Sequence, residues 1–409
     1  MRSRIPLIAL TGALTLTLVS CAGEPATPAP TDTDAAAGGH GAVSGAEEAA
    51  EPQLGLTSID PDGAVTHLDL LDESVADLGE ISALTDMATD GRYLFATTDE
   101  GVEIVDSGVW TWDHVDHFHY YRAAPALLGA VDGAGPATIA TTNLSTTGGT
   151  GISFAGSGDA VLLDTEALSK GTITELFRLE REPHDGLVVP VGSFALVTHA
   201  EDGAGTTVVG YTADGKKIGV EEPCADPAGT ITTRVGAVIG CADGALLAHV
   251  DADELHIERI PYPADASAPA ATSFDNREGR PTVAALAGPD RIWLLDTRER
   301  SWTLLPAPAP LVHVTAVDDD EGHVLALARD GRVFVLNGAD GAVLAETAPL
   351  TAESLAGGAQ PTLVADQQRA YLSAPTEQRL YEIDYADGAR VARTFETSTP
   401  PAFVAETGR

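Results

Sequence analysis

The 409-residue chain is strongly acidic, since 61 Asp and Glu residues against 23 Lys and Arg give it a formal net charge of -38 at pH 7. Such a charge argues against a protein that binds nucleic acid or an anionic lipid surface through electrostatic attraction, because both carry negative charge. Hydrophobic residues nevertheless make up 44% of the chain, enough for a large core.

The first 20 residues have the form of a secretory signal peptide. Arg2 and Arg4 precede an apolar run over residues 5–19, and residues 18–21 read Leu-Val-Ser-Cys, which is a lipobox. This start resembles a bacterial lipoprotein precursor, and the resemblance implies a lipid on Cys21. The apolar run is short for a membrane span. We therefore expect an exported protein that is lipid-anchored on the extracytoplasmic face of the cell membrane.

Residues 21–52 are rich in Ala, Gly, Pro, Thr, Ser and acids, and they contain no aromatic residue. A segment of this composition buries too little apolar area to offset its ordering entropy. We expect a flexible tether that ends where the folded domain begins, at residue 53.

Two of the three cysteines, Cys224 and Cys241, lie in the folded part of the chain and close a short loop. In an exported protein such a pair favours a disulfide. A cysteine-based metal site is the alternative, but no second Cys or His lies two to four residues from either one.

Seven related segments follow the tether, and each joins two short apolar strands across a turn. They cover residues 82–96, 126–140, 184–198, 230–241, 282–295, 312–327 and 362–373. Such repeats are typical of a β-propeller, in which each repeat is one four-stranded blade. A hairpin at residues 59–66 precedes the first repeat. We predict an all-β chain with one seven-bladed propeller over residues 53–405, closed by this N-terminal hairpin joining the last blade.

Residues 110–121 read Trp-Thr-Trp-Asp-His-Val-Asp-His-Phe-His-Tyr-Tyr and hold three of the chain's 11 histidines. Imidazole is the commonest protein ligand of zinc, with carboxylate as a frequent companion. If residues 117–121 form a strand, its two-residue period places two of these imidazoles on one face. A polar surface strand is the alternative, but the clustering favours metal binding. The candidate ligands are His114, His117, His119 and Asp116.

Two further histidines belong to the third repeat. His184 stands just before its first strand, where blade-starting strands converge near a propeller axis, so we expect it close to the histidine-rich stretch. A channel-lining histidine that binds water or a backbone group is the alternative. His199 ends the second strand and is a weaker candidate. Three imidazoles, with or without a carboxylate, suit Zn(II), although Cu(II), Ni(II) and Mn(II) accept the same ligand types.

Three sequence features together resemble the AztD-type zinc metallochaperones, namely residues 108–121, 182–184 and 240–244. Members of that family are exported propeller proteins that hand zinc to the solute-binding protein of a zinc ABC importer. The resemblance implies that the histidine-rich stretch and His184 belong to one metal site. It also implies that Cys224 pairs with Cys241.

The sequence thus predicts a non-enzymatic, monomeric protein that captures Zn(II) outside the membrane and delivers it to the solute-binding protein of a zinc ABC importer, with no nucleic-acid partner. One alternative is a hydrolase in which an open zinc position activates water, with Glu182 as the nearest candidate base. Another is an exported propeller that binds a ligand other than metal. The chain has no GxSxG motif and no phosphate-binding loop, which favours the first function.

Overall fold

The computed structural model describes residues 41–113 and 117–409. The predicted signal peptide, Cys21 and most of the predicted tether lie outside this part of the chain, as do His114 and Asp116. The regular secondary structure of the described residues is almost entirely β-strand, with two short helices, α1 (Thr165–Ser169) and α2 (Ala352–Ala356). Within these residues no helix has both the length and the apolar character that crossing a membrane requires.

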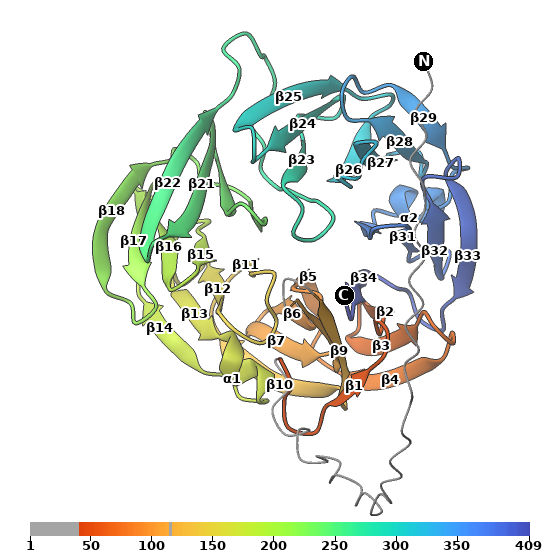
Figure 1. Cartoon of the computed structure of the whole chain (residues 1–409), viewed down its shortest axis with the longest axis horizontal. Coiled ribbons are helices and arrows are strands. Elements are labelled where there is room, and N and C mark those ends of the chain that lie inside the picture. The colour runs from red at the N-terminus through yellow and green to blue at the C-terminus, as the bar shows by residue number, and fades with distance from the viewer. Residues whose placement is uncertain (1–40, 114–116) are drawn as a thin grey trace, which may run out of the picture. The chain divides into compact units, whose positions relative to one another are not determined.

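Eight sheets form a ring around a common axis (Figure 1). Blade 1 comprises β34 (Phe403–Thr407), β2 (Gly55–Ile59), β3 (Ala64–Asp69) and β4 (Val75–Glu80). Blade 2 comprises β5 (Leu84–Thr89), β6 (Tyr93–Thr98), β7 (Gly101–Asp106) and β10 (Ala126–Asp132). Blade 3 comprises β11 (Ala137–Ala140), β12 (Gly149–Phe154), β13 (Ala160–Asp164) and β14 (Glu175–Leu179). Blade 4 comprises β15 (Val188–Val191), β16 (Phe194–Glu201), β17 (Ala204–Thr212) and β18 (Lys217–Pro223).

The second half of the ring repeats this plan. Blade 5 comprises β19 (Thr230–Thr232), β20 (Ala237–Cys241), β21 (Gly244–Asp251) and β22 (Glu254–Pro261). Blade 6 comprises β23 (Thr282–Leu286), β24 (Arg291–Asp296) and β25 (Ser301–Pro306). Blade 7 comprises β26 (Leu311–Ala316), β27 (His323–Ala328), β28 (Val333–Asn337) and β29 (Val343–Glu346). Blade 8 comprises β30 (Leu363–Ala365), β31 (Ala370–Ala374), β32 (Arg379–Asp384) and β33 (Arg390–Glu396).

The all-β propeller prediction is confirmed, but the described residues form eight blades, so the predicted number of seven was wrong. Blade 1 was not among the seven predicted repeats because its strands come from residues far apart in sequence. The N-terminal hairpin of β2 and β3 was expected to join the last repeat, yet β2 pairs with β34 in a separate sheet. In addition, residues 126–132 form the fourth strand of blade 2, not the first strand of a new repeat.

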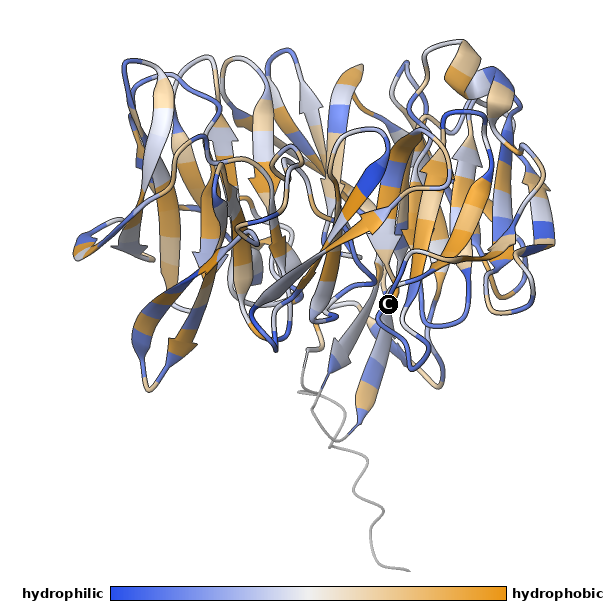
Figure 2. Ribbon diagram, turned by 90° about the horizontal axis from the view of Figure 1, so that it is seen from above, coloured by the Kyte–Doolittle hydropathy of each residue, from blue (hydrophilic) through white to orange (hydrophobic). Residues whose placement is uncertain are grey.

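The core lies between the blades. The buried apolar residues form eight clusters in the described chain, and each cluster joins one pair of neighbouring blades. The middle strands are therefore apolar on both faces, and every residue of β27 is buried. Figure 2 shows the ring from the side, with hydrophobic residues running through the blades. Each blade is stabilised by its two neighbours, because a single sheet could bury only one face.

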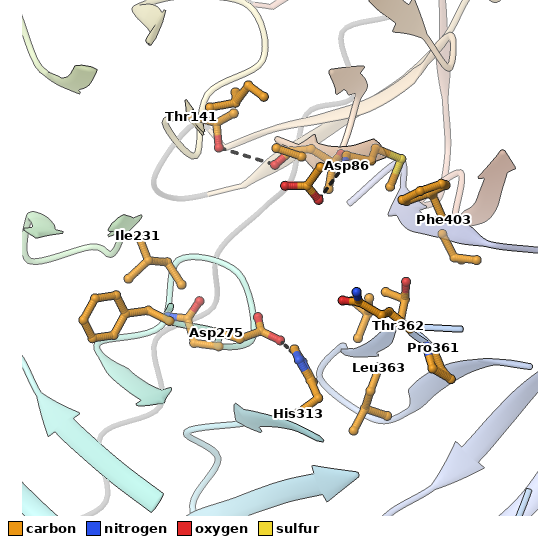
Figure 3. A pocket seen from close by; sticks show the side chains of 18 of the residues that line it. Asp86, Thr141, Ile231, Asp275, His313, Pro361, Thr362, Leu363 and Phe403 are labelled. Carbon is orange, nitrogen blue, oxygen red and sulfur yellow. Dashed lines mark hydrogen bonds and ion pairs between the residues drawn. The ribbon is translucent and has the colours of Figure 1, made fainter. Parts of the chain in front are cut away.

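The inner strands surround a central cavity of about 1270 Å³, lined by residues of β5, β11, β19, β26, β30 and β34 (Figure 3). Its lining is mixed, with Thr and Asn side chains beside Leu, Ile and Phe. A hydrogen bond between His313 Nε2 and Asp275 Oδ2, which are 2.8 Å apart, lies at the wall of this cavity. The described cavity is thus a polar-apolar channel along the ring axis.

The ring is closed by residues from its two ends in sequence. In the antiparallel pair of β2 and β34, Gly55 lies opposite Thr407 and Ile59 lies opposite Phe403. Beyond β34, Arg409 donates to Glu406 and lies 2.6 Å from the carboxylate of Glu278. The closing strand is therefore held by backbone pairing on one side and by ion pairs near the channel on the other.

Candidate metal site

The histidine-rich stretch forms a hairpin that is inserted into blade 2 between β7 and β10. Its strands are β8 (Val109–Asp113) and β9 (Phe118–Arg122), and β1 (Glu47–Ala49) pairs with β9 as a third strand. The register places Trp112 opposite His119 and Glu48 opposite Tyr121. Side chains of directly paired residues share one face of a sheet, so Glu48, Trp112, His119 and Tyr121 lie on the same face.

The base of the hairpin is a buried ion pair. Arg92 donates from Nε and Nη2 to the two carboxylate oxygens of Asp106, at 3.0 and 2.7 Å. The side chains of Arg92 and Asp106 are only 2% and 10% exposed. Asp106 also accepts a hydrogen bond from the backbone of Gly108, the residue just before β8. The bidentate pair therefore fixes the point at which the hairpin leaves blade 2.

A column of flat side chains connects this ion pair to the histidines. The Arg92 guanidinium lies 3.8 Å from the centroid of the Trp110 ring, a cation–π contact. Trp110 stacks on Tyr121 with centroids 5.3 Å apart, and Tyr121 stacks on His119 at 6.3 Å. Because Trp110 and Tyr121 are each 1% exposed, the column is rigidly enclosed below His119.

Residues ahead of β1 cover the side of this column. The carbonyl of Gly41 accepts a hydrogen bond from Trp110 Nε1 at 3.1 Å. A Cβ atom at Gly41 would lie 2.3 Å from Trp112 Cγ, and the φ angle of Gly41 is +75°. Only glycine fits there. The segment predicted as a tether at residues 21–52 thus includes, from residue 41 onward, a part that packs on the hairpin.

The two histidines of β9 and its preceding turn lie against each other. His117 Nε2 and His119 Nε2 are 3.0 Å apart, and the ring centroids are 4.7 Å apart. Two nitrogens bound to one tetrahedral zinc ion at ordinary bond lengths lie about 3.3 Å apart. The two nitrogens are therefore close to the spacing of two ligands of one ion, and a small movement of the side chains would reach it.

Glu48 orients His119. Its Oε1 lies 2.7 Å from His119 Nδ1, and the side chains of His119 and Glu48 are 20% and 55% exposed. A carboxylate in this position accepts a hydrogen bond from Nδ1–H, which leaves the Nε2 lone pair directed toward His117. This carboxylate–histidine arrangement is a common support for a metal-binding imidazole, and it reaches His119 from β1, 71 residues away in sequence.

His184 lies in the loop before β15, where it is 8% exposed. Its Nδ1 is 2.7 Å from the carbonyl oxygen of Glu182, and its Nε2 is 3.0 Å from Thr198 Oγ1. Both ring nitrogens are therefore engaged within blade 4 and its entry loop. His199 lies nearby, and its Nε2 is 3.0 Å from the Tyr211 hydroxyl. Burial, followed by the charge of Arg181, lowers the pKa of His199 to about 4, so its ring is neutral at pH 7.

The strand directions separate His184 from the hairpin. β7 runs parallel to the inner strand β5, because both pair antiparallel with β6. β7 ends just before the hairpin, so the hairpin leaves the ring at the face where inner strands end. His184 precedes the inner strand β15 and lies at the face where inner strands begin. The structure thus does not bring His184 to His117 and His119, because the hairpin follows a third strand and does not lead into an inner strand.

The described part of the hairpin accordingly offers two imidazoles and one supporting carboxylate. No group of three or more His, Cys, Asp or Glu residues suited to a metal ion occurs within residues 41–113 and 117–409. His114 and Asp116, the other predicted ligands, lie outside those residues. On the hairpin, two of the predicted ligands, His117 and His119, have ring nitrogens 3.0 Å apart.

The cysteines form the disulfide that the sequence favoured. Cys224 and Cys241 are joined, with their Cα atoms 5.2 Å apart and both residues 1% exposed. The bond links the segment after β18 to the end of β20, so it ties blade 4 to blade 5. A disulfide at this place is consistent with folding in an oxidising compartment.

Comparison with solved structures identifies the fold. Apo AztD from Citrobacter koseri superposes with a TM-score of 0.75 at 19% sequence identity, over 88% of this chain and 100% of that chain. A crystal structure of Citrobacter koseri AztD also gives a TM-score of 0.75, at 20% identity over 88% and 99% of the two chains. The chain has the fold of AztD.

Kluyveromyces lactis Hsv2 also resembles it, with a TM-score of 0.50 and 9% identity over 76% of this chain and 98% of that chain. At these identities the likeness to AztD and to Hsv2 establishes the architecture alone. No protein-family model matches the sequence, and no curated protein sequence matches it either.

Proposed function

We propose that this protein binds Zn(II) as cargo outside the cytoplasm and delivers it to the solute-binding protein of a zinc ABC importer. The observation that carries the proposal is the pair of imidazole nitrogens, His117 Nε2 and His119 Nε2, 3.0 Å apart on a hairpin at one face of the ring. Glu48 orients one of the two rings. The propeller fold shared with AztD and the similarity of residues 108–121 to that family support the same function.

The exposed position of the pair suits transfer of the ion. A chaperone must give up its ligands one at a time as the acceptor supplies its own, so the metal has to be reachable from solvent. His117 is exposed, while His119 is held from below by Tyr121 and from the side by Glu48. We propose that His117 leaves first and His119 last. His114 and Asp116 are the proposed additional ligands on the basis of sequence.

The location and partners follow from the sequence and the disulfide. We propose export through the signal peptide at residues 1–20, lipid attachment at Cys21 and a position on the extracytoplasmic face of the membrane. The Cys224–Cys241 disulfide supports an oxidising compartment. The proposed partner is a protein, the zinc-binding component of an importer, and the chemistry is ligand exchange without turnover of an organic substrate.

The first experiment compares zinc binding by the parent protein and by a His117→Ala, His119→Ala double variant. The protein is freed of metal, titrated with zinc against a chromophoric chelator and analysed for metal content. We expect about one tightly bound zinc in the parent. Loss of two direct ligands should weaken binding by more than the roughly 10–100-fold that loss of an outer partner causes.

A His184→Ala, His199→Ala double variant is the matched control, because it also removes two imidazoles but at the other face of the ring. It should bind zinc as the parent does. If the control loses zinc and the hairpin variant keeps it, the proposed site is wrong. Transfer is then measured by mixing zinc-loaded protein with metal-free solute-binding protein. Movement of zinc no faster than to a passive chelator would contradict the chaperone role.

A further inference from the structure

Two histidines of blade 5 stand apart from all other histidines that the structure describes. In seven of the nine described histidines, a ring nitrogen has a hydrogen-bond partner. These seven are His67, His117, His119, His184, His199, His313 and His323. His249 and His256 have none within the described residues. They lie directly opposite each other in the antiparallel pair of β21 and β22. Their rings face one another with centroids 5.5 Å apart and an angle of 23° between planes.

The hairpin that carries them is short and well defined. β21 and β22 are joined by a two-residue turn, Ala252 and Asp253, with φ angles of +48° and +65°. Positive φ at both positions is the signature of a type I′ turn, which fixes the register of the strands on either side. The backbone thus places His249 and His256 directly opposite each other, with both side chains on one face of the sheet.

The pair combines access with an unsatisfied ring atom. His256 is exposed and His249 is partly buried. The Nδ1 atom of His249 is buried and has no hydrogen-bond partner in the described chain. Buried polar atoms without a partner are uncommon and destabilise the folded protein. No side-chain hydrogen bond within the described residues holds either ring in its orientation.

A carboxylate lies next to the pair. Glu258 is two residues beyond His256 on β22 and therefore on the same face. The hydrogen bond from Arg300 is the main cause that lowers the pKa of Glu258, and the nearby His249 and His256 act in the same direction. The Nε atom of Arg300 is 2.9 Å from Glu258 Oε2, so the carboxylate is engaged by a residue that follows β24.

We propose that His249 and His256 form a second metal site, independent of the hairpin on blade 2, that takes an imidazole-preferring divalent transition metal. Two facing imidazoles supply two adjacent ligands, and water completes the shell. With nitrogen ligands and open positions, Cu(II) binds most tightly, followed by Ni(II) and Zn(II). Arg300 weakens metal binding at this site for two reasons. It is hydrogen-bonded to the carboxylate of Glu258, which would be a third ligand, and it adds a positive charge next to the metal.

The test uses the full folded protein with the His117→Ala, His119→Ala substitutions, which removes the zinc site proposed above. Cu(II), Ni(II) and Zn(II) are titrated separately, and copper loading is followed by electron paramagnetic resonance, which reports nitrogen ligands. We expect one site with nitrogen hyperfine structure and the affinity order Cu(II), then Ni(II) and Zn(II). A further His256→Ala substitution, at an exposed position, should weaken copper binding at least tenfold and remove that spectrum.

Arg300→Gln provides a change in the opposite direction. It should tighten binding of all three metals, because it releases Glu258 and removes a positive charge, and a second substitution, Glu258→Gln, should cancel that gain. Unchanged copper binding after His256→Ala would overturn the proposal, as would an Arg300→Gln variant that binds no more tightly. Neither result bears on the hairpin site, because two of its proposed ligands, His117 and His119, are absent from this background.

Discussion

The buried ion pair at the base of the hairpin makes the most informative stability prediction. Asp106→Ala removes both hydrogen bonds that Arg92 makes with the carboxylate and leaves a guanidinium with 2% exposure in the interior. Bonds that involve a charged group contribute about 1.5–3 kcal/mol each. Breaking a buried ion pair by removing one partner costs about 3–5 kcal/mol, since the remaining charge is unpaired. We expect the free energy of unfolding to fall by about 3–5 kcal/mol.

Replacing both partners should behave differently. Arg92→Met with Asp106→Leu removes the charges together and fills the space with apolar atoms, which is often neutral or stabilising. The double variant does lose the cation–π contact with Trp110, so the column beneath His119 should loosen. We therefore expect near-parent stability but weaker zinc binding, because His119 is then less well oriented.

The assay is urea denaturation followed by tryptophan fluorescence, with zinc affinity as a second readout. Lys170→Ala is the matched control, since it breaks an ion pair with Glu166 whose two side chains are 65% and 59% exposed. Exposed pairs of this kind contribute little. If Asp106→Ala destabilised the protein no more than Lys170→Ala, the interpretation of Arg92 and Asp106 as the support of the hairpin would be refuted.

Three further outcomes are expected. Glu48→Gln should weaken zinc binding about 10–100-fold and leave stability unchanged, because it removes only the hydrogen-bond partner of His119 Nδ1. The zinc affinity is measured by the same competition titration, and an unchanged affinity would contradict that role. Reduction of Cys224–Cys241, which spans 17 residues, should lower the free energy of unfolding by about 3 kcal/mol through chain entropy, measured by urea denaturation with and without reductant. Burial raises the pKa of Glu406 and of Asp90 to about 7, so the folded protein keeps protons that the unfolded chain releases. The free energy of unfolding should therefore fall between about pH 4.5 and pH 7, by at most about 1.4 kcal/mol per pH unit for each group, and Glu406→Gln should make the profile flatter than that of the parent.

The propeller could be predicted because each blade repeats the same local pattern of apolar strands and tight turns. The number of blades could not be counted in that way. Blade 1 takes three strands from residues 55–80 and one from residues 403–407, and no local pattern links them. The inserted hairpin also separates β10 from β7 in the sequence. Residues 126–132 therefore have the pattern of an inner strand that starts a new repeat, although they form the outer strand of blade 2.

In the candidate site too, contacts within one strand could be predicted, whereas contacts between residues far apart in sequence could not. His117 and His119 could be placed on one face because the period of a strand is a local property. Glu48 could not be predicted, since it reaches His119 through backbone pairing of β1, which almost any composition permits. His249 and His256 are seven residues apart in sequence, and they become neighbours only because a two-residue turn lies midway between them. The distance between His184 and the hairpin could not be predicted either, because the face of the ring on which each lies depends on the strand directions.

The closing strand also links the ring to the hairpin. Thr111 of β8 donates from its backbone N–H to the carbonyl of Arg409 and from its hydroxyl to the carbonyl of Gly408. If β34 detaches from β2, these bonds are lost together with the packing that β34 contributes to blade 1. Under the proposed function, metal bound to the hairpin would then favour the closed ring, and by reciprocity the closed ring would favour the metal. Zinc should therefore slow amide hydrogen exchange in β34, and ring opening should set a limit on how long the ion is retained.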